Sequence, residues 1–362
     1  MLRSLKIENF RCFQNFELQQ LGQLNLLVGT NNSGKTSILE AIQILYSQAN
    51  LEPLRKLMTI RGEYFWREEN PSLKHIELDV RHLFYGHKID EGSSFSISGK
   101  KDNNLKYINV FVGNTEKLNA DNLSPELREL NELFLDIKCS EEERKIDPLP
   151  LSLQKGFPGS YIRYTHYLEH PLAATQFVRS FSLTHDEMID LFNDIVLTPE
   201  EALIIEALQT IEPSIERIAV VNQTKIYNGS HTGFVVRLAN SDQRIPIGSM
   251  GDGIWRILGL TLAIVSARNG VLLVDEIDTG LHFSAMNDMW KLIWKTAKKL
   301  NVQVFATTHN SDCWTSLAAI ANTEHPSEEG ITIHRIEKGK TNSVVFTERQ
   351  IVIAAERGIE VR

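Results

Sequence analysis

The chain has 362 residues, of which 42% are hydrophobic and 23% charged, and its formal net charge is −8 at pH 7. These values are typical of a globular protein with one large domain or two, and the negative charge argues against a protein that coats nucleic acid through bulk electrostatics. Three scattered cysteines and the lack of an apolar run near ~20 residues predict a cytoplasmic protein without a membrane span.

The first part of the chain is predicted to consist of strands around one helix. Residues 2–8 alternate polar and apolar side chains, which predicts a strand and not a signal peptide, and a strand at 15–20 would pair with it. A buried strand is expected at 24–28, followed by apolar residues at helical spacing up to about residue 49. Three later segments predict a small antiparallel layer: they lie at 74–84, 93–98 and 106–112.

A phosphate-binding loop lies between the strand at 24–28 and the helix after it. The sequence Gly29-Thr30-Asn31-Asn32-Ser33-Gly34-Lys35-Thr36 contains glycines that allow backbone N–H groups to wrap a phosphate. Lys35 would reach the β- and γ-phosphates, and the Thr36 hydroxyl would ligate Mg²⁺. The chain is therefore predicted to bind ATP or GTP. The predicted nucleotide contacts in this region are Gly29, Asn31, Asn32, Ser33, Gly34, Lys35, Thr36 and Ser37.

The middle of the chain is predicted to be an inserted, mainly helical lobe at 115–200. Glu and Leu dominate residues 123–145, and a second helical stretch is expected at 184–212. There is no sustained heptad repeat, so long coiled-coil arms are not expected. The lobe would divide a nucleotide-binding domain into residues 1–114 and 201–362.

The last part of the chain is predicted to complete an α/β core. Residues 217–238 indicate a strand–turn–strand. A strand–helix–strand unit and two further strands are expected after it: they lie at 271–274, 284–300, 302–307, 331–337 and 343–347.

Two carboxylates directly follow the apolar strand at 271–274. Asp275 would hold Mg²⁺ through water, opposite Thr36, and Glu276 would polarise the water that attacks the γ-phosphate. An apolar run followed by Asp-Glu is a weak signal alone. Its position after a phosphate loop makes it a strong one.

A short segment ahead of these carboxylates suits an anion. Ser249-Met250-Gly251-Asp252-Gly253 begins an apolar helix, where free N–H groups and the positive end of the helix dipole favour negative charge. The segment lies about twenty residues before the Asp-Glu strand and resembles the signature motif of ABC-type ATPases. In that family the motif contacts the γ-phosphate bound by a second subunit, which implies this role for Ser249 and Gly251. Met250 replaces the first glycine of the usual pattern.

Two more motifs of the same family follow in order. Asp278-Thr279-Gly280-Leu281-His282 resembles the D-loop, and Phe305-Ala306-Thr307-Thr308-His309 resembles the switch strand. A lone histidine after a strand is usually structural. As the fourth element in the family's order, His309 is predicted to sense the γ-phosphate as a catalytic residue.

Further motifs indicate which group of ABC-type ATPases the sequence resembles. Ile7-Glu8-Asn9-Phe10-Arg11 and the form of the phosphate loop are similar to the SMC/RecF group of ABC ATPases and differ from transporter subunits. Residues 275–284 and 306–313 resemble the ATPase half of OLD (overcoming lysogenization defect) proteins. The resemblance covers residues 1–50 and 195–315.

This resemblance implies an α/β ABC-type P-loop ATPase with a mixed sheet and the inserted helical lobe. ATP and Mg²⁺ would be its cofactors, Arg11 would belong to the nucleotide contacts, and a head-to-tail homodimer would enclose two nucleotides. Typical OLD proteins continue into a TOPRIM nuclease domain. This sequence has no Asp-x-Asp pair and stops at Arg362, so nuclease activity is not expected in it.

The expected role is a regulatory ATPase that senses DNA or phage and controls a separately encoded effector, such as a nuclease or toxin, in anti-phage defence. A RecF-like DNA-repair ATPase is one alternative, and an ATP-bound scaffold that sequesters a toxin with little turnover is another. His166-Tyr167-Leu168-Glu169-His170 matches a metalloprotease pattern, but Pro171 disfavours the helix which that site needs. Four lysines could meet DNA phosphate or form a solvated helix face: Lys291, Lys295, Lys298 and Lys299.

Overall fold

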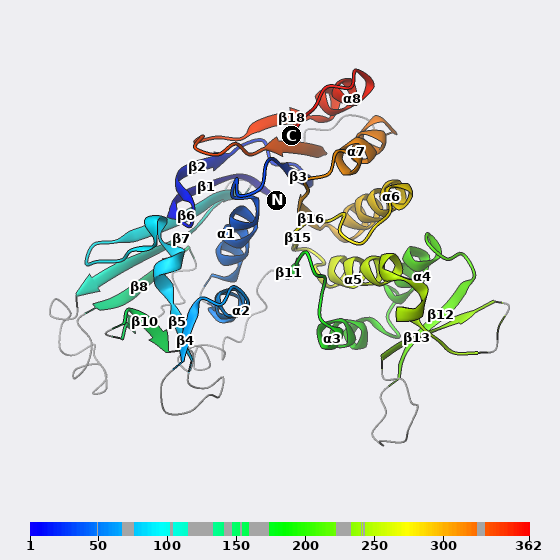
Figure 1. Cartoon of the computed structure of the whole chain (residues 1–362), viewed down its shortest axis with the longest axis horizontal. Helices are drawn as coiled ribbons and strands as arrows, with labels where there is room; N and C mark the ends of the chain where they lie inside the picture. Colours follow the sequence, from blue (N-terminus) through cyan, green and yellow to red (C-terminus); the bar gives the residue numbers. More distant parts are fainter. Residues whose placement is uncertain are drawn as a thin grey trace. The chain divides into compact units, whose positions relative to one another are not determined.

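Two six-stranded sheets organise the described part of the chain (Figure 1). The computed structural model describes residues 1–48, 50–66, 76–101, 104–114, 133–140, 147–152, 154–158, 174–221, 233–239, 241, 243–323 and 330–362. Each sheet belongs to one of two units. Unit 1 comprises Met1–Leu21, Asn32–Ala173 and Ile336–Ser343. Unit 2 comprises Gly22–Asn31, Ala174–Arg335 and Val344–Arg362.

Unit 1 is built on an antiparallel sheet with the strand order β2-β1-β6-β7-β8-β9. Its strands are β1 (Leu2–Phe10), β2 (Phe13–Leu18), β6 (Ser94–Lys101), β7 (Asn104–Asn114), β8 (Leu133–Cys139) and β9 (Leu149–Pro150). In β1 the apolar side chains of Leu5 and Ile7 are buried, while Lys6 between them is exposed, as a strand with one covered face requires. The predicted pairing of the first two strands is confirmed, with Leu5 opposite Leu18.

Helices and a second, smaller sheet complete unit 1. The helices are α1 (Lys35–Ser47) and α2 (Glu52–Ile60), with short 3-10 turns η2 (Val80–Leu83) and η3 (Tyr85–His87). The small sheet has the order β10-β5-β4, formed by Gly156–Pro158, Ile76–Asp79 and Tyr64–Trp66. The predicted small layer is therefore divided: β5 lies in this sheet, whereas β6 and β7 extend the sheet of β1.

Unit 2 is built on a mainly parallel sheet with the order β11-β15-β16-β3-β17-β18. Its strands are β3 (Leu24–Val28), β11 (Thr175–Val178), β15 (Val271–Val274), β16 (Gln303–Thr307), β17 (Ile331–Arg335) and the antiparallel edge strand β18 (Val344–Thr347). Every residue of β3, β15 and β16 is buried, which is typical of parallel strands covered on both faces. The predicted strand–helix–strand unit at 271–307 is confirmed.

Helices α5 (Asp252–Ser266), α6 (Phe283–Leu300), α7 (Ser311–Thr323) and α8 (Glu348–Glu356) form a row in which neighbours contact each other (Figure 1). Two further helices, α3 (His185–Ile195) and α4 (Glu201–Gln209), pack on α5. A small sheet follows with the order β12-β13-β14, formed by Ile215–Val221, Gly233–Leu238 and Ile245–Pro246, and leads to the 3-10 turn η8 (Ile247–Met250). Among the described residues, no helix has the length and apolar character to cross a membrane.

The helical prediction for residues 123–145 is wrong at Leu133–Cys139, which is strand β8. Its side chains at 135, 137 and 139 are buried with less buried neighbours between them, and β7 supplies the pairing partner. The content of Glu and Leu favours a helix, but the period of two and the neighbouring strand prevail. The stretch 184–212 does contain two helices, α3 and α4. The helix start at 124–125, the motif at 166–170 and the turn at 228–229 lie outside the described residues, and the lobe boundaries stay predictions.

A buried histidine in β17 makes the stability of the fold sensitive to acid. His334 is fully buried with its Nε2 3.0 Å from the Thr332 hydroxyl, and burial lowers its pKa to about 3. Between about pH 3 and its unfolded pKa of about 6.5, the unfolded chain binds a proton that the folded chain does not. The stability from the neutral ring is thus complete above pH 6.5 and lost as the pH falls.

We expect the free energy of unfolding to drop from pH 6.5 to 5 by about 2 kcal/mol more in the native chain than in a His334→Gln variant. Urea titrations at both pH values measure this difference. The matched control is His87→Gln, because His87 is exposed. Equal pH slopes for the native chain and His334→Gln would contradict the prediction.

Candidate functional site

The loop after β3 has a backbone that only glycine tolerates at Gly34. Its φ of 100° lies in the left-handed region, and a Cβ there would lie 2.4 Å from the Phe13 ring and 2.8 Å from Cys12 Sγ. Gly29 and Asn32 also have positive φ values, of 144° and 60°. Three residues between β3 and α1 thus have a positive φ, which suits a backbone that wraps an anion.

The start of α1 is chemically suited to phosphate. Gly34 is its N-cap, no side chain of the described residues caps it, and its first turn has no acidic residue. The positive end of the helix dipole is therefore not compensated by a side chain. Ser33 is 4% exposed, and its hydroxyl has no hydrogen-bond partner among the described residues. A buried hydroxyl of this kind needs an explanation, and a bound phosphate would supply one.

The other predicted loop contacts lie in or beside the first turn of α1. Lys35 and Thr36 occupy the first two positions of the helix, and Ser37 follows them. The side chain of Lys35 is buried and that of Thr36 is half-buried. Asn31 is exposed in the loop. These positions fit an ammonium and a hydroxyl that serve a nucleotide and its metal ion.

Arg11, a predicted nucleotide contact, is buried among protein partners. Its guanidinium is 5% exposed and donates to Glu40 Oε2 at 3.1 Å, to Glu63 Oε1 at 2.5 Å and to the His82 carbonyl at 3.0 Å. These contacts tie the turn between β1 and β2 to α1, which carries Glu40. Nucleotide binding by Arg11 stays a prediction.

The acidic pair after β15 is held by one hydroxyl from the neighbouring strand. Thr307, the last residue of β16, donates from Oγ1 to Asp275 Oδ1 at 2.7 Å and accepts from the Glu276 N–H at 2.8 Å. The Asp275 N–H donates to the Val178 carbonyl at 2.8 Å. Asp275 and Glu276 are thus fixed at the carboxyl ends of parallel strands, where ligands bind in open α/β sheets.

Glu276 and His309 lie together. Glu276 Oε1 is 3.2 Å from His309 Nε2, and both side chains are partly exposed, at 42% and 39%. Glu276 has a φ of 47°, an uncommon value for a residue with a side chain. Strained backbone of this kind collects at functional sites. Next to the pair, Asp278 accepts from the Thr308 hydroxyl at 2.6 Å.

Arg256 was not among the residues predicted for the site, but it contacts the backbone of the acidic pair Asp275 and Glu276. It lies on α5, is 3% exposed, and donates to the carbonyl oxygens of Arg179 at 2.9 Å, Glu276 at 2.9 Å and Asp275 at 3.3 Å. Burial lowers the pKa of its guanidinium to about 10. The signal in the sequence is an arginine inside the apolar stretch at 254–258, because a buried charge needs buried partners.

The predicted signature residues lie at the start of the same helix. Ser249 is exposed in η8, and its hydroxyl donates to the Pro246 carbonyl at 2.7 Å. Gly251 is exposed with a φ of 96°, and apart from its own chain neighbours no described atom lies within 4 Å of where its Cβ would be. Within the described part of the chain no side chain caps α5.

Residues 24–312 match the model of a family described as "AAA domain, putative AbiEii toxin, Type IV TA system", AAA_21. The chain belongs to the AAA_21 family. This AAA_21 member is 23% identical to an ATP/GTP phosphatase of Helicobacter pylori over 337 residues, which cover 86% of each protein. It is also 51% identical to the DNA replication and repair protein RecF of Rickettsia massiliae, over 45 residues that make up 12% of each protein.

Solved structures give the fold of the AAA_21 chain. An SMC head bound to the C-winged helix domain of ScpA has a TM-score of 0.51 and 12% identity, with 96% of this chain and 98% of that chain covered. An SMC head with an extended coiled coil, bound to the C-terminal domain of ScpA derived from Pyrococcus furiosus, has a TM-score of 0.50 and 10% identity, with 99% of each covered. The prediction of an ABC-type P-loop ATPase fold with a mixed sheet is confirmed.

Proposed function

We propose that this chain is a Mg²⁺-dependent ATPase. The observation that carries the proposal is the position of three adjacent parallel strands, β15, β16 and β3. Their carboxyl ends lie at one edge of the sheet and lead to Asp275 and Glu276, to His309, and to the phosphate loop at Gly29. This is the edge at which a nucleotide would meet both a base and a phosphate cradle.

The residues have separate roles in the proposed reaction. Glu276 takes a proton from a water molecule while the water oxygen bonds to the γ-phosphorus and the bond from that phosphorus to the β-phosphate oxygen breaks. His309 lies 3.2 Å from the Glu276 carboxylate and orients it. His309 also senses whether the γ-phosphate is present. Lys35 and the loop N–H groups bind the phosphates. Thr36 and Asp275 would hold Mg²⁺, which neutralises charge on the β- and γ-phosphates.

A second copy of the chain would complete each site. The exposed Ser249 and Gly251 at the uncapped start of α5 are suited to a γ-phosphate bound by a partner subunit. ATP would then close a head-to-tail homodimer, and hydrolysis would reopen it. The open space at Gly251 supports this arrangement, because a neighbouring nucleotide can approach the backbone there.

The cellular role that we favour is control of a partner effector, such as a nuclease or toxin, in cytoplasmic anti-phage defence. The motifs similar to OLD proteins and the description of the AAA_21 family support it. The short RecF match supports the alternative of a DNA-repair ATPase, and a toxin-sequestering scaffold is the third reading. Copurification of the ATP-locked chain with the product of a neighbouring gene separates these roles: a nuclease or toxin favours effector control, and replication proteins favour repair.

Loss of the loop lysine tests nucleotide binding. Lys35→Ala removes a charge-assisted contact worth roughly 1.5–3 kcal/mol, so ATP affinity measured by calorimetry should fall by about ten- to a hundredfold. Lys338→Ala, at an exposed lysine, is the control and should keep native affinity. Native affinity in Lys35→Ala would exclude the loop at 29–36 as the nucleotide site.

A further inference from the structure

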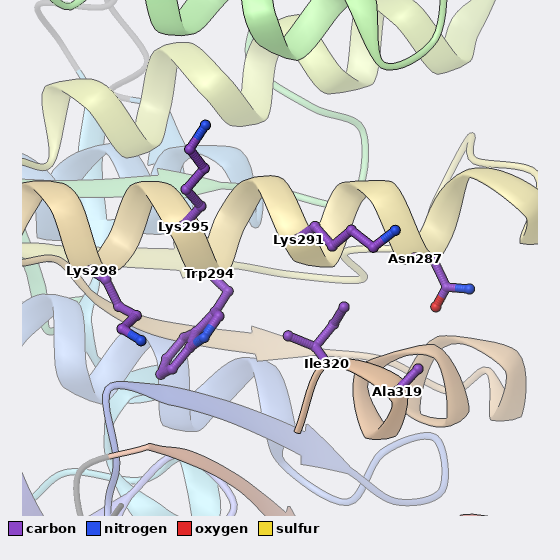
Figure 2. A pocket seen from close by; sticks show the side chains of 7 residues that line it. All are labelled: Asn287, Lys291, Trp294, Lys295, Lys298, Ala319 and Ile320. Carbon is purple, nitrogen blue, oxygen red and sulfur yellow. The ribbon is translucent and has the colours of Figure 1, made fainter. Parts of the chain in front are cut away.

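A pocket of about 650 Å³ lies between α6 and α7 (Figure 2). Helix α6 contributes Lys291, Lys295, Lys298 and Trp294 to its lining, and α7 contributes Ala319 and Ile320. A volume of this size accommodates one or two large side chains with room to spare. All of these residues belong to unit 2.

The Trp294 indole lines the apolar part of the pocket. Trp294 is 6% exposed, and its indole Nε1 is buried without a hydrogen-bond partner among the described residues. One turn earlier on α6, the Trp290 Nε1 donates to the Cys313 carbonyl at 2.9 Å. Figure 2 shows the Trp294 ring between Lys298 and Ile320. Because the polar atom of the indole is buried, the Trp294 wall of the pocket offers a ligand apolar surface.

The three lysines form a row and do not converge. Their spacing of four and three residues places them on one face of α6 over about 10 Å. Figure 2 shows their ammonium groups pointing in three different directions. A single phosphate would need convergent donors. A row of separate cations instead matches carboxylates spread along a segment of chain.

The lysines can exchange their present partners. Lys291 Nζ lies 3.2 Å from Asp288, and Lys295 Nζ lies 3.2 Å from Glu206, with both lysine side chains more than 60% exposed. Such surface pairs contribute about 0–1 kcal/mol, so carboxylates of a ligand can replace them at little cost. Lys298 Nζ lies 5.0 Å from the Trp294 ring centroid and covers the indole.

We propose that this pocket binds an acidic helix of a partner protein. One apolar side chain of that helix enters the cavity beside Trp294, and carboxylates at positions i, i+4 and i+7 lie over the lysine row. Charge complementarity favours this occupant, because three lysines line the pocket on this face of α6. A groove between two helices is a common receptor for an amphipathic helix. Single-stranded nucleic acid fits less well, because the buried Trp294 ring offers no open face for base stacking.

The test uses a labelled helical peptide of about four turns, with glutamates at i, i+4 and i+7 and a central leucine. A peptide of the same composition, rearranged so that its glutamates do not share a face, is the control. Fluorescence anisotropy with the full chain should show micromolar binding of the first peptide and at least ~10-fold weaker binding of the second. Raising the salt concentration should weaken the first interaction.

Substitutions assign the binding to the pocket. The double variant Lys291→Glu and Lys295→Glu should weaken peptide binding by about tenfold or more, and so should Ala319→Trp, which fills the mouth of the cavity. The matched control Lys338→Glu and Lys340→Glu alters two exposed lysines elsewhere and should have no effect. Thermal melts confirm that each variant is folded. The proposal is overturned if the peptide fails to bind at ~1 mM, if the rearranged peptide binds equally, or if an oligothymidine binds with the same dependence on the two lysines in place of the peptide.

Discussion

Replacing Glu276 with glutamine should leave ATP binding intact and slow hydrolysis by about 10²–10⁴-fold. Glutamine keeps the shape of the side chain and its contact with His309, but it cannot accept the proton of the attacking water. The contact in question is the 3.2 Å approach of Oε1 to Nε2. Calorimetry measures the binding of ATP, and single-turnover release of phosphate measures the chemical step.

A control glutamate separates this effect from a change in surface charge. Glu216→Gln alters a side chain that is 44% exposed and paired with Arg237, so its turnover should match that of the native chain. Glu276→Gln should also accumulate as a closed ATP-bound dimer, visible by light scattering, because the step that opens the dimer is blocked. Native turnover in Glu276→Gln would mean that another residue activates the water.

Replacing Arg256 with methionine should lower the free energy of unfolding by about 3–5 kcal/mol and also reduce turnover. Methionine fills much of the same volume but donates nothing, so the carbonyl oxygens of Arg179, Asp275 and Glu276 lose a buried charged donor. Because two of these carbonyls belong to the acidic pair, the position of Glu276 loses support as well. Urea unfolding measures the first effect, and steady-state hydrolysis measures the second.

Arg268→Met is the matched control for Arg256. Arg268 is 60% exposed and pairs with Glu200, so its loss should cost no more than about 1 kcal/mol. If Arg256→Met were as stable as Arg268→Met, the three carbonyl contacts would contribute little to the fold. An Arg256→Lys variant should recover part of the stability, since an ammonium can reach fewer of the three oxygens at once.

The sharp loop after β3 and the acidic pair after β15 could be predicted from the sequence because their signals are local. Glycine at position 34 is the residue type that favours a left-handed backbone, and Asp275 and Glu276 directly follow an uninterrupted apolar run. The meeting of Glu276 and His309 followed from the order of the motifs, because the carboxyl ends of neighbouring parallel strands share an edge. These features depend on few residues outside their own segments.

Other features depend on partners far along the chain and could not be read in this way. Strand β8 lies in a stretch whose content of Glu and Leu favours a helix, and its conformation is decided by pairing with β7. Arg256 acquires its role only when α5 packs beneath the ends of β11 and β15. The two carboxylates that bind Arg11, from residues 40 and 63, likewise become its neighbours only in the folded unit.

The interleaving of the two units along the chain has a consequence for biosynthesis. Unit 1 and unit 2 alternate in six segments, and β18 and α8 of unit 2 are supplied by residues 344–362. Unit 1 cannot be completed before residues 336–343 are translated, nor unit 2 before residues 344–362, so neither unit can finish folding while the other is still to be synthesised. The long sequence separations also imply slow folding, with β3 exposed until β16 and β17 emerge to flank it. Such a nascent chain is a natural client for chaperones that shield apolar strands during translation.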